Sequence, residues 1–164
     1  MRATASRVVS APLDTVWEIV SNPERALDFM SGITRWEVES DHPTGLGARY
    51  RMLLRVGSAE VGGLIEIVEW EPPRELAWTS VTGIDQRGRW RLRPAPGGRT
   101  RAEIRLAYGV AGGGIAGWIA ERIAAPAVGS HLETTVDQLA RLVEHQRSRE
   151  LAAQRRAARA ARAH

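Results

Sequence analysis

The chain has 164 residues, 43% of them hydrophobic and 26% charged, which is typical of one soluble globular domain. It has no cysteine, and all 23 basic residues are arginine, which excludes disulfides, thiolate sites and lysine Schiff bases. The net charge of +4 is uneven, because residues 147–164 hold six arginines against one glutamate and therefore carry +5. The rest of the chain is close to neutral, so its charge indicates nothing about a ligand.

The order of segments predicts one domain over residues 1–146, followed by an arginine- and alanine-rich tail over residues 147–164. The amino terminus has no continuous apolar run, so we expect no signal peptide. No segment has the length of a membrane span. We therefore expect a cytoplasmic protein.

The first 30 residues predict one strand and two short helices. Residues 3–9 have small and β-branched side chains, which favour a strand. Pro12 suits the first turn of a helix, and Asn22 with Pro23 ends that helix and caps a second one.

Apolar and charged residues then alternate in six segments, which predicts half-buried antiparallel strands. The segments lie near residues 35–39, 49–56, 61–70, 76–82, 89–93 and 100–110. Each strand has one apolar and one charged face, so one side of the sheet needs a cover. On the charged side, Arg89 and Arg91 are expected to meet Glu103.

A long helix is predicted over residues 115–143, where apolar residues recur three and four positions apart. Pro126 falls inside it, so a kink or a break is expected near Ala125. This is the only element long enough to close the apolar side of the sheet. The predicted fold is α+β: a curved seven-stranded antiparallel sheet wrapped around a long C-terminal helix, with two short helices after the first strand.

Several short motifs mark turns and packing positions: Ala11-Pro12, Asn22-Pro23-Glu24-Arg25, Trp70-Glu71-Pro72-Pro73-Arg74, and Gly88 with Trp90. Together with the order of elements, they resemble the START/SRPBCC helix-grip superfamily, and within it the polyketide cyclase/dehydrase and lipid-transport group. The resemblance covers about residues 2–145. It implies a deep hydrophobic pocket between sheet and helix, but not one activity, because the group includes both carriers and cyclases.

Aromatic residues on the apolar faces are the main candidates for ligand binding. They offer flat apolar surface with a polar tip, which suits a polycyclic or acyl ligand, and the alternative is that they fill the core. The predicted ligand-binding residues are Trp36, Tyr50, Met52, Trp78, Trp90, Ile104, Tyr108, Trp118 and His131. The turn residues Asp85, Gln86 and Arg87 could rim an entrance or form a solvated loop.

His131 and Glu66 are the candidate catalytic residues. His131 could act in the pocket as an acid or base, although a hydrogen-bonded residue at its edge is the favoured interpretation. Glu66 is buried if Leu64 and Val68 face inward and lies on the outer face if Ile65 and Ile67 do, and the outer position is favoured. A bulge near Gly62-Gly63 could exchange which of these two sets of side chains faces inward. The histidine spacing predicts no metal site, and no cofactor is expected.

The leading hypothesis is a protein that binds a hydrophobic or aromatic small molecule, either a lipid or a polyketide-like compound. The alternative is a polyketide cyclase or dehydratase acting in the same cavity. The arginine tail lacks aromatic residues for base stacking, so nucleic-acid binding is not favoured and a solvated extension is expected. The oligomeric state is left open between monomer and homodimer.

Overall fold

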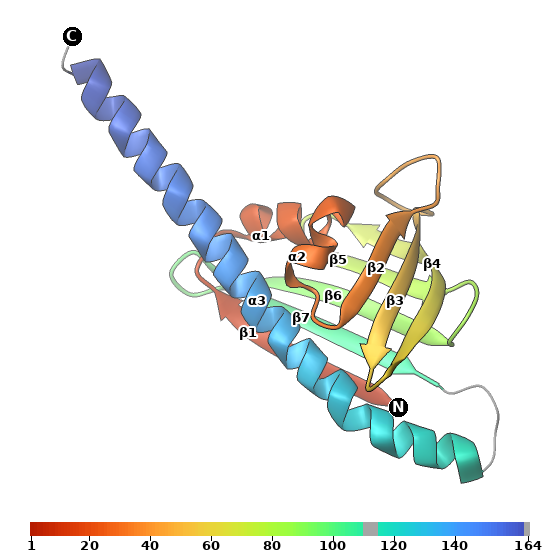
Figure 1. The fold of residues 1–164 in the computed structure, drawn as a ribbon. Helices are drawn as coiled ribbons and strands as arrows, with labels where there is room; N and C mark the ends of the chain where they lie inside the picture. Colours follow the sequence, from red (N-terminus) through yellow and green to blue (C-terminus); the bar gives the residue numbers. More distant parts are fainter. Residues whose placement is uncertain (110–114, 163–164) are drawn as a thin grey trace.

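The computed structural model describes residues 1–109 and 115–162, with side chains in the last helix from residue 125 onward. Figure 1 shows a sheet crossed by one long helix. The elements, in chain order, are β1 (Arg2–Val9), α1 (Leu13–Val20), the 3-10 turn η1 (Pro23–Arg25), α2 (Ala26–Phe29), β2 (Ile33–Val38), β3 (Arg49–Val56), β4 (Ala59–Glu71), β5 (Glu75–Ser80), β6 (Gln86–Ala95), β7 (Arg99–Tyr108) and α3 (Ile115–Arg162).

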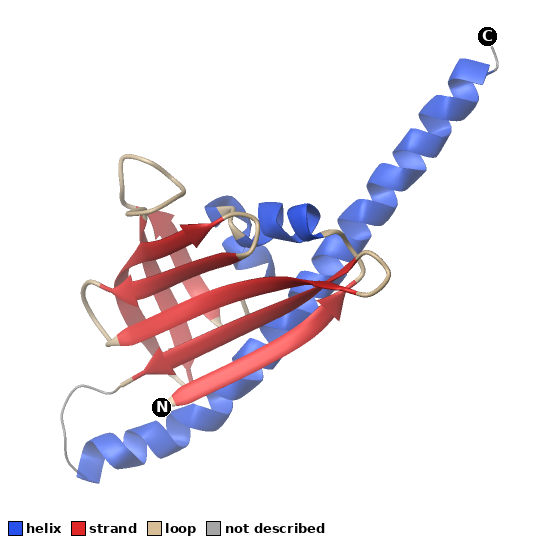
Figure 2. Cartoon of the chain, turned by 180° about the vertical axis from the view of Figure 1, so that it is seen from behind, coloured by secondary structure: helices blue, strands red, loops and turns tan. Residues whose placement is uncertain are grey.

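The seven strands form one antiparallel sheet in the order β1-β7-β6-β5-β4-β3-β2. Seen from behind, the sheet curves around the helices and leaves its other face uncovered (Figure 2). This confirms the predicted α+β helix-grip architecture. The two short helices also follow β1 as expected. Asn22 caps the 3-10 turn η1, which leads into α2, by accepting a hydrogen bond from Glu24 N on its side chain (3.0 Å).

The core fills the space between the concave face of the sheet and the helices. Alternate strand residues are buried there, among them Tyr50, Trp90 and Ile104. From α3 comes the apolar stripe Leu132, Val136, Leu139 and Val143. The intervening strand residues, such as Arg91 and Arg105, form ion pairs on the outer face, as the alternation predicts.

Strand β4 contains an irregularity that decides the direction of its side chains. Ile65 and Ile67 are buried, and the pairing with β5 shifts register between Ile67 and Glu69. The extra residue, Val68, is exposed, which lets Trp70 return to the inner face. The bulge is therefore at Val68, whereas the sequence pointed to Gly62-Gly63.

A kink or a break was expected near Ala125, and the break is wrong, because helix α3 runs without interruption through Pro126. The helix bends toward its amino-terminal end, in agreement with the other alternative, a kink (Figures 1 and 2). It is tied to β1 and the residue after it: Arg7 pairs with Asp137, Ser10 N donates to Glu144 Oε1 (2.9 Å), and Arg147 donates to Ser10 O (2.7 Å).

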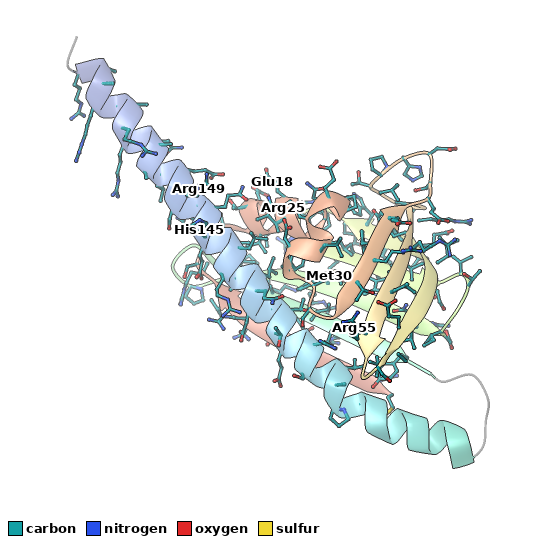
Figure 3. The ribbon with its side chains drawn as sticks, viewed as in Figure 1. Glu18, Arg25, Met30, Arg55, His145 and Arg149 are labelled. Atoms are coloured by element: carbon teal, nitrogen blue, oxygen red, sulfur yellow. The ribbon has the colours of Figure 1, made fainter. Side chains whose placement is uncertain are left out.

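Helix α3 is much longer than its apolar stripe, since it continues to Arg162. From Ser148 to Arg162 every residue is exposed. Beyond Arg149 the helix projects away from the other elements (Figure 3). Residues 144–162 contain no glycine, proline or β-branched residue, so intrinsic propensity supports the helix where packing does not.

Candidate functional site

A pocket of about 230 Å³ lies between β3, β4, β6, β7 and α3, and we call it the main pocket. Its walls are largely aliphatic: Met52, Leu54 and Val56 come from β3, Val61 from β4 and Val128 from α3. Gly62 lines the pocket through its backbone, and a Cβ there would lie 2.2 Å from the carbonyl oxygen of Met52 on β3. The arrangement is suited to an apolar molecule of modest size.

Two polar side chains, Gln86 and Tyr108, also line the main pocket. Gln86 on β6 and Tyr108 on β7 are direct partners in the pairing of these two strands. Gly109 N donates to Asp85 O (2.9 Å), so Gln86 and Tyr108 form a non-hydrogen-bonded pair, the type with the closer side chains. Gln86 is only 7% exposed, and its Nε2 donates to Met52 Sδ (3.3 Å).

Most of the predicted aromatic residues lie elsewhere, beneath α1 and α2. Trp36, Tyr50, Trp78 and Trp90 surround a void of about 30 Å³, room for about one water molecule. Trp36 stacks on Tyr50 with ring centroids 5.1 Å apart, and Trp90 meets Phe29 edge-on at 6.1 Å. These rings pack the core around that small void.

Trp78 depends on the residue opposite it. Its ring lies directly over Gly88 on β6, where any Cβ would collide with it. The indole N–H groups of Trp36 and Trp78 are buried and have no hydrogen-bond partner within the described part of the chain.

Among the other predicted ligand-binding residues, Met52 and Tyr108 line the main pocket. Ile104 is 1% exposed in the core and lines neither space. The side chain of Trp118 lies outside the described residues. The role of these residues in ligand binding stays a prediction.

His131 joins three elements instead of lining the main pocket. Its Nε2 lies 3.0 Å from the carbonyl oxygen of Arg55, which can only accept, so Nε2 carries the proton. In the neutral ring, Nδ1 then accepts from Ser31 Oγ at 3.0 Å. A Cβ on Gly32, whose φ is +79°, would lie 2.7 Å from the imidazole. The histidine thus holds α3 against the loop before β2 and the end of β3 that carries Arg55.

Glu66 lies on the outer face of β4, where its carboxylate pairs with Arg49 at 2.6 Å. The favoured sequence interpretation therefore matches its position. The carboxylate is on the opposite side of the sheet from the main pocket.

Tyr50 is also poorly placed for proton transfer. Burial raises the pKa of its phenol to about 12, and its hydroxyl donates to Pro43 O (2.6 Å). The phenol therefore stays protonated near neutral pH and fixes the loop between β2 and β3.

Gln86 is the residue that the sequence reasoning misplaced, since it was grouped with Asp85 and Arg87 in a turn that either rims an entrance or is solvated. Both of these neighbours are exposed, but Gln86 is in the pocket wall. The alternation of β6, followed back from Trp90 through Gly88, puts Gln86 on the inner face. This two-residue alternation was the feature of the sequence that could have placed Gln86 in the pocket wall.

The sequence model of one protein family, described as polyketide cyclase / dehydrase and lipid transport, matches residues 1–144. The chain belongs to this family. No curated protein matches the chain significantly. For members of this family, binding of hydrophobic small molecules or cyclase-type chemistry is the coarse expectation.

Solved structures agree on the START-like fold. The protein TTHA0849 from Thermus thermophilus is 21% identical, with a TM-score of 0.77 over 89% of this chain and 99% of its own. The Zhui aromatase/cyclase from Streptomyces sp. R1128 is 17% identical, with a TM-score of 0.76 over 89% and 94%. A START superfamily protein from Mycobacterium smegmatis is 14% identical, with a TM-score of 0.67 over 88% and 98%. At these identities the likeness shows the fold alone.

None of the helices among the described residues is long and apolar enough to cross a membrane.

Proposed function

We propose that the protein binds a hydrophobic small molecule in the main pocket. The observation that supports this is the aliphatic wall built by β3, β4, β7 and α3, in which Leu54, Val61 and Leu106 remain only partly buried. Apolar side chains left around open space gain free energy when a ligand removes them from water, at about 25 cal/mol per Å².

Binding without catalysis is favoured by the positions of the proton-transfer candidates. His131 uses both ring nitrogens in contacts with Ser31 and Arg55. Glu66 is on the outer face with Arg49. Neither residue is among the described residues that line the main pocket, whereas general acid–base catalysis needs a group within hydrogen-bond reach of the ligand.

The family description and the Zhui aromatase/cyclase fold support polyketide cyclization or dehydration as the second candidate function. In the described part of the main pocket, the polar side chains that a poly-β-ketone chain would meet are Gln86 and Tyr108, whose hydroxyl donates to Met1 Sδ (3.9 Å). Of these two, only the phenol of Tyr108 can transfer a proton, because an amide is a poor proton carrier, so this alternative rests on Tyr108 or on residues outside the described part.

The proposed function is tested by filling the pocket. The replacement Val61→Trp places an indole in the wall of the main pocket, and it should weaken binding of naphthalene by about tenfold or more, because the ligand loses its volume. Equilibrium dialysis measures the affinity. The matched control is Val81→Trp, at an exposed position outside the pocket, which should leave the affinity unchanged. Equal binding by all three proteins would refute the proposal.

The same proteins can also be used to distinguish a carrier from an enzyme. Incubation with a poly-β-ketone mimic should give binding but no faster ring closure than in buffer. Catalysed closure that is lost in His131→Ala while affinity persists would replace the carrier by the cyclase, since acid–base groups typically contribute roughly 10²- to 10⁴-fold to rate.

A further inference from the structure

Gln86 is a buried amide whose hydrogen-bonding capacity is only partly used. Its side chain offers two N–H donors and one carbonyl acceptor. One donor meets Met52 Sδ at 3.3 Å, a weak acceptor, and no other described residue bonds the side chain. Because the sulfur can only accept, it also fixes which end of the amide faces it. The second N–H and the carbonyl oxygen are left for another partner.

The position of Gln86 makes the unused N–H and carbonyl groups of its amide accessible from the main pocket. Gln86 opens β6, where its backbone N–H donates to Ser80 Oγ (3.2 Å) and holds the residue in place. Its direct partner on β7 is Tyr108, the other polar residue that lines the pocket. The other described side chains that line the pocket are aliphatic or, in Met52, a thioether, so its polar side chains gather at this one place.

The described walls of the main pocket carry no charge that would match a charged ligand. Among the described residues that line it, none is an arginine, aspartate, glutamate or histidine. An ion that loses its water there without a counter-charge would bind at a large cost. The side chains of Glu121 and Arg122 lie outside the described residues, so a charged ligand belongs in the test.

We propose that the pocket selects neutral apolar molecules that carry a hydroxyl group, and that Gln86 is the residue that recognises the hydroxyl. A hydroxyl can accept from the free N–H and donate to the carbonyl oxygen, which a ketone or an ether cannot do. This inference rests on the proposed function, because it assigns the ligand class of the same pocket.

The test compares four probes with one ring skeleton by equilibrium dialysis at neutral pH: naphthalene, 2-naphthol, 2-methoxynaphthalene and 2-naphthoate. We expect 2-naphthol to bind about tenfold more tightly than naphthalene, because it satisfies both free groups of Gln86. The ether, which can only accept, should fall between the two. The ionised naphthoate should bind most weakly.

Two variants assign the preference to Gln86. In Gln86→Leu, which has a similar size and removes the buried amide, naphthol and naphthalene should bind within about twofold of each other. In the matched control Gln154→Leu, on the exposed part of α3, the tenfold preference should remain. A melting curve shows whether each variant is folded.

The outcomes separate this inference from the proposed function. Equal affinity for naphthol and naphthalene in the natural protein, with both lost in Val61→Trp, would overturn the role of Gln86 and leave the pocket's function intact. Tightest binding of naphthoate would overturn the neutral ligand class. If no probe binds to the natural protein, both the inference and the proposed function fail.

Discussion

At the scale of single residues, Glu75 organises the outer face of the sheet. Its carboxylate accepts hydrogen bonds from Arg89 (2.7 Å), Arg91 (2.9 Å) and Arg93 (2.7 Å). The sequence had paired Arg89 and Arg91 with Glu103. Glu103 does lie opposite Arg91 on β7, but both arginines bind Glu75 on β5, and Glu103 binds Arg105 on its own strand. Burial by itself would raise the pKa of Glu75, and the hydrogen bonds from Arg91, Arg93 and Arg89 outweigh it and hold that pKa below the ordinary 4.5.

This lowered pKa gives a stability prediction with a definite sign. The folded state binds the Glu75 proton more weakly than the unfolded state, so its contribution is complete above pH 4.5 and is lost as pH falls through the lower folded pKa. The change Glu75→Gln should cost about 1–2 kcal/mol of unfolding free energy at neutral pH, and less in acid. Urea unfolding measured across this pH range checks it, with Glu60→Gln, an exposed pair at 3.5 Å, as the control. A cost that stays constant with pH would contradict the assignment.

At the scale of elements, helix α3 has two parts with different roles. Through Val143 it packs on the sheet, and Arg147 still bonds Ser10 O. From Ser148 onward all the described residues are exposed. Deleting the chain from Ser148 should therefore change the unfolding free energy by less than about 0.5 kcal/mol. Tm should then move by less than about 2 °C.

Circular dichroism would report both consequences of that deletion, a loss of helix signal and an unchanged midpoint. Binding of naphthalene should also be unchanged, because no residue of this part lines the main pocket. A fall in Tm that depends on protein concentration would instead show that the extension packs on a second copy of the chain.

At the scale of the whole molecule, the sheet is covered on one face only, and α3 supplies a large part of that cover. Leu139, on the face of α3 that packs on the sheet, is completely buried. Replacing it with alanine should cost about 3 kcal/mol, through lost burial and the cavity left behind. For a chain of this length, Tm should fall by roughly 6–12 °C.

The matched control for this prediction lies on the same helix. Leu151 is 44% exposed, and Leu151→Ala should stay within about 0.5 kcal/mol of the natural protein. Similar losses in the two variants would mean that helix propensity, and not packing on the sheet, determines the effect.

The sequence by itself determined the fold. Alternation along the strands, the turns at glycine and proline, and the apolar stripe of α3 are local patterns with fixed periods, so they specify the seven strands and the inner face. The extension beyond Val143 was underestimated, because alanine and arginine carry strong helix propensity without a visible apolar period.

Tertiary structure decided the orientation of Glu66 and the place of the pocket. Both alternating sets of β4 are apolar, so only the bulge at Val68 reveals which set is buried. Four of the predicted aromatic residues, Trp36, Tyr50, Trp78 and Trp90, pack beneath α1 and α2, while the main pocket lies between β3, β4, β6, β7 and α3. The size and place of such a pocket depend on how closely elements that are distant in the sequence pack together. A local pattern in the sequence does not contain that information.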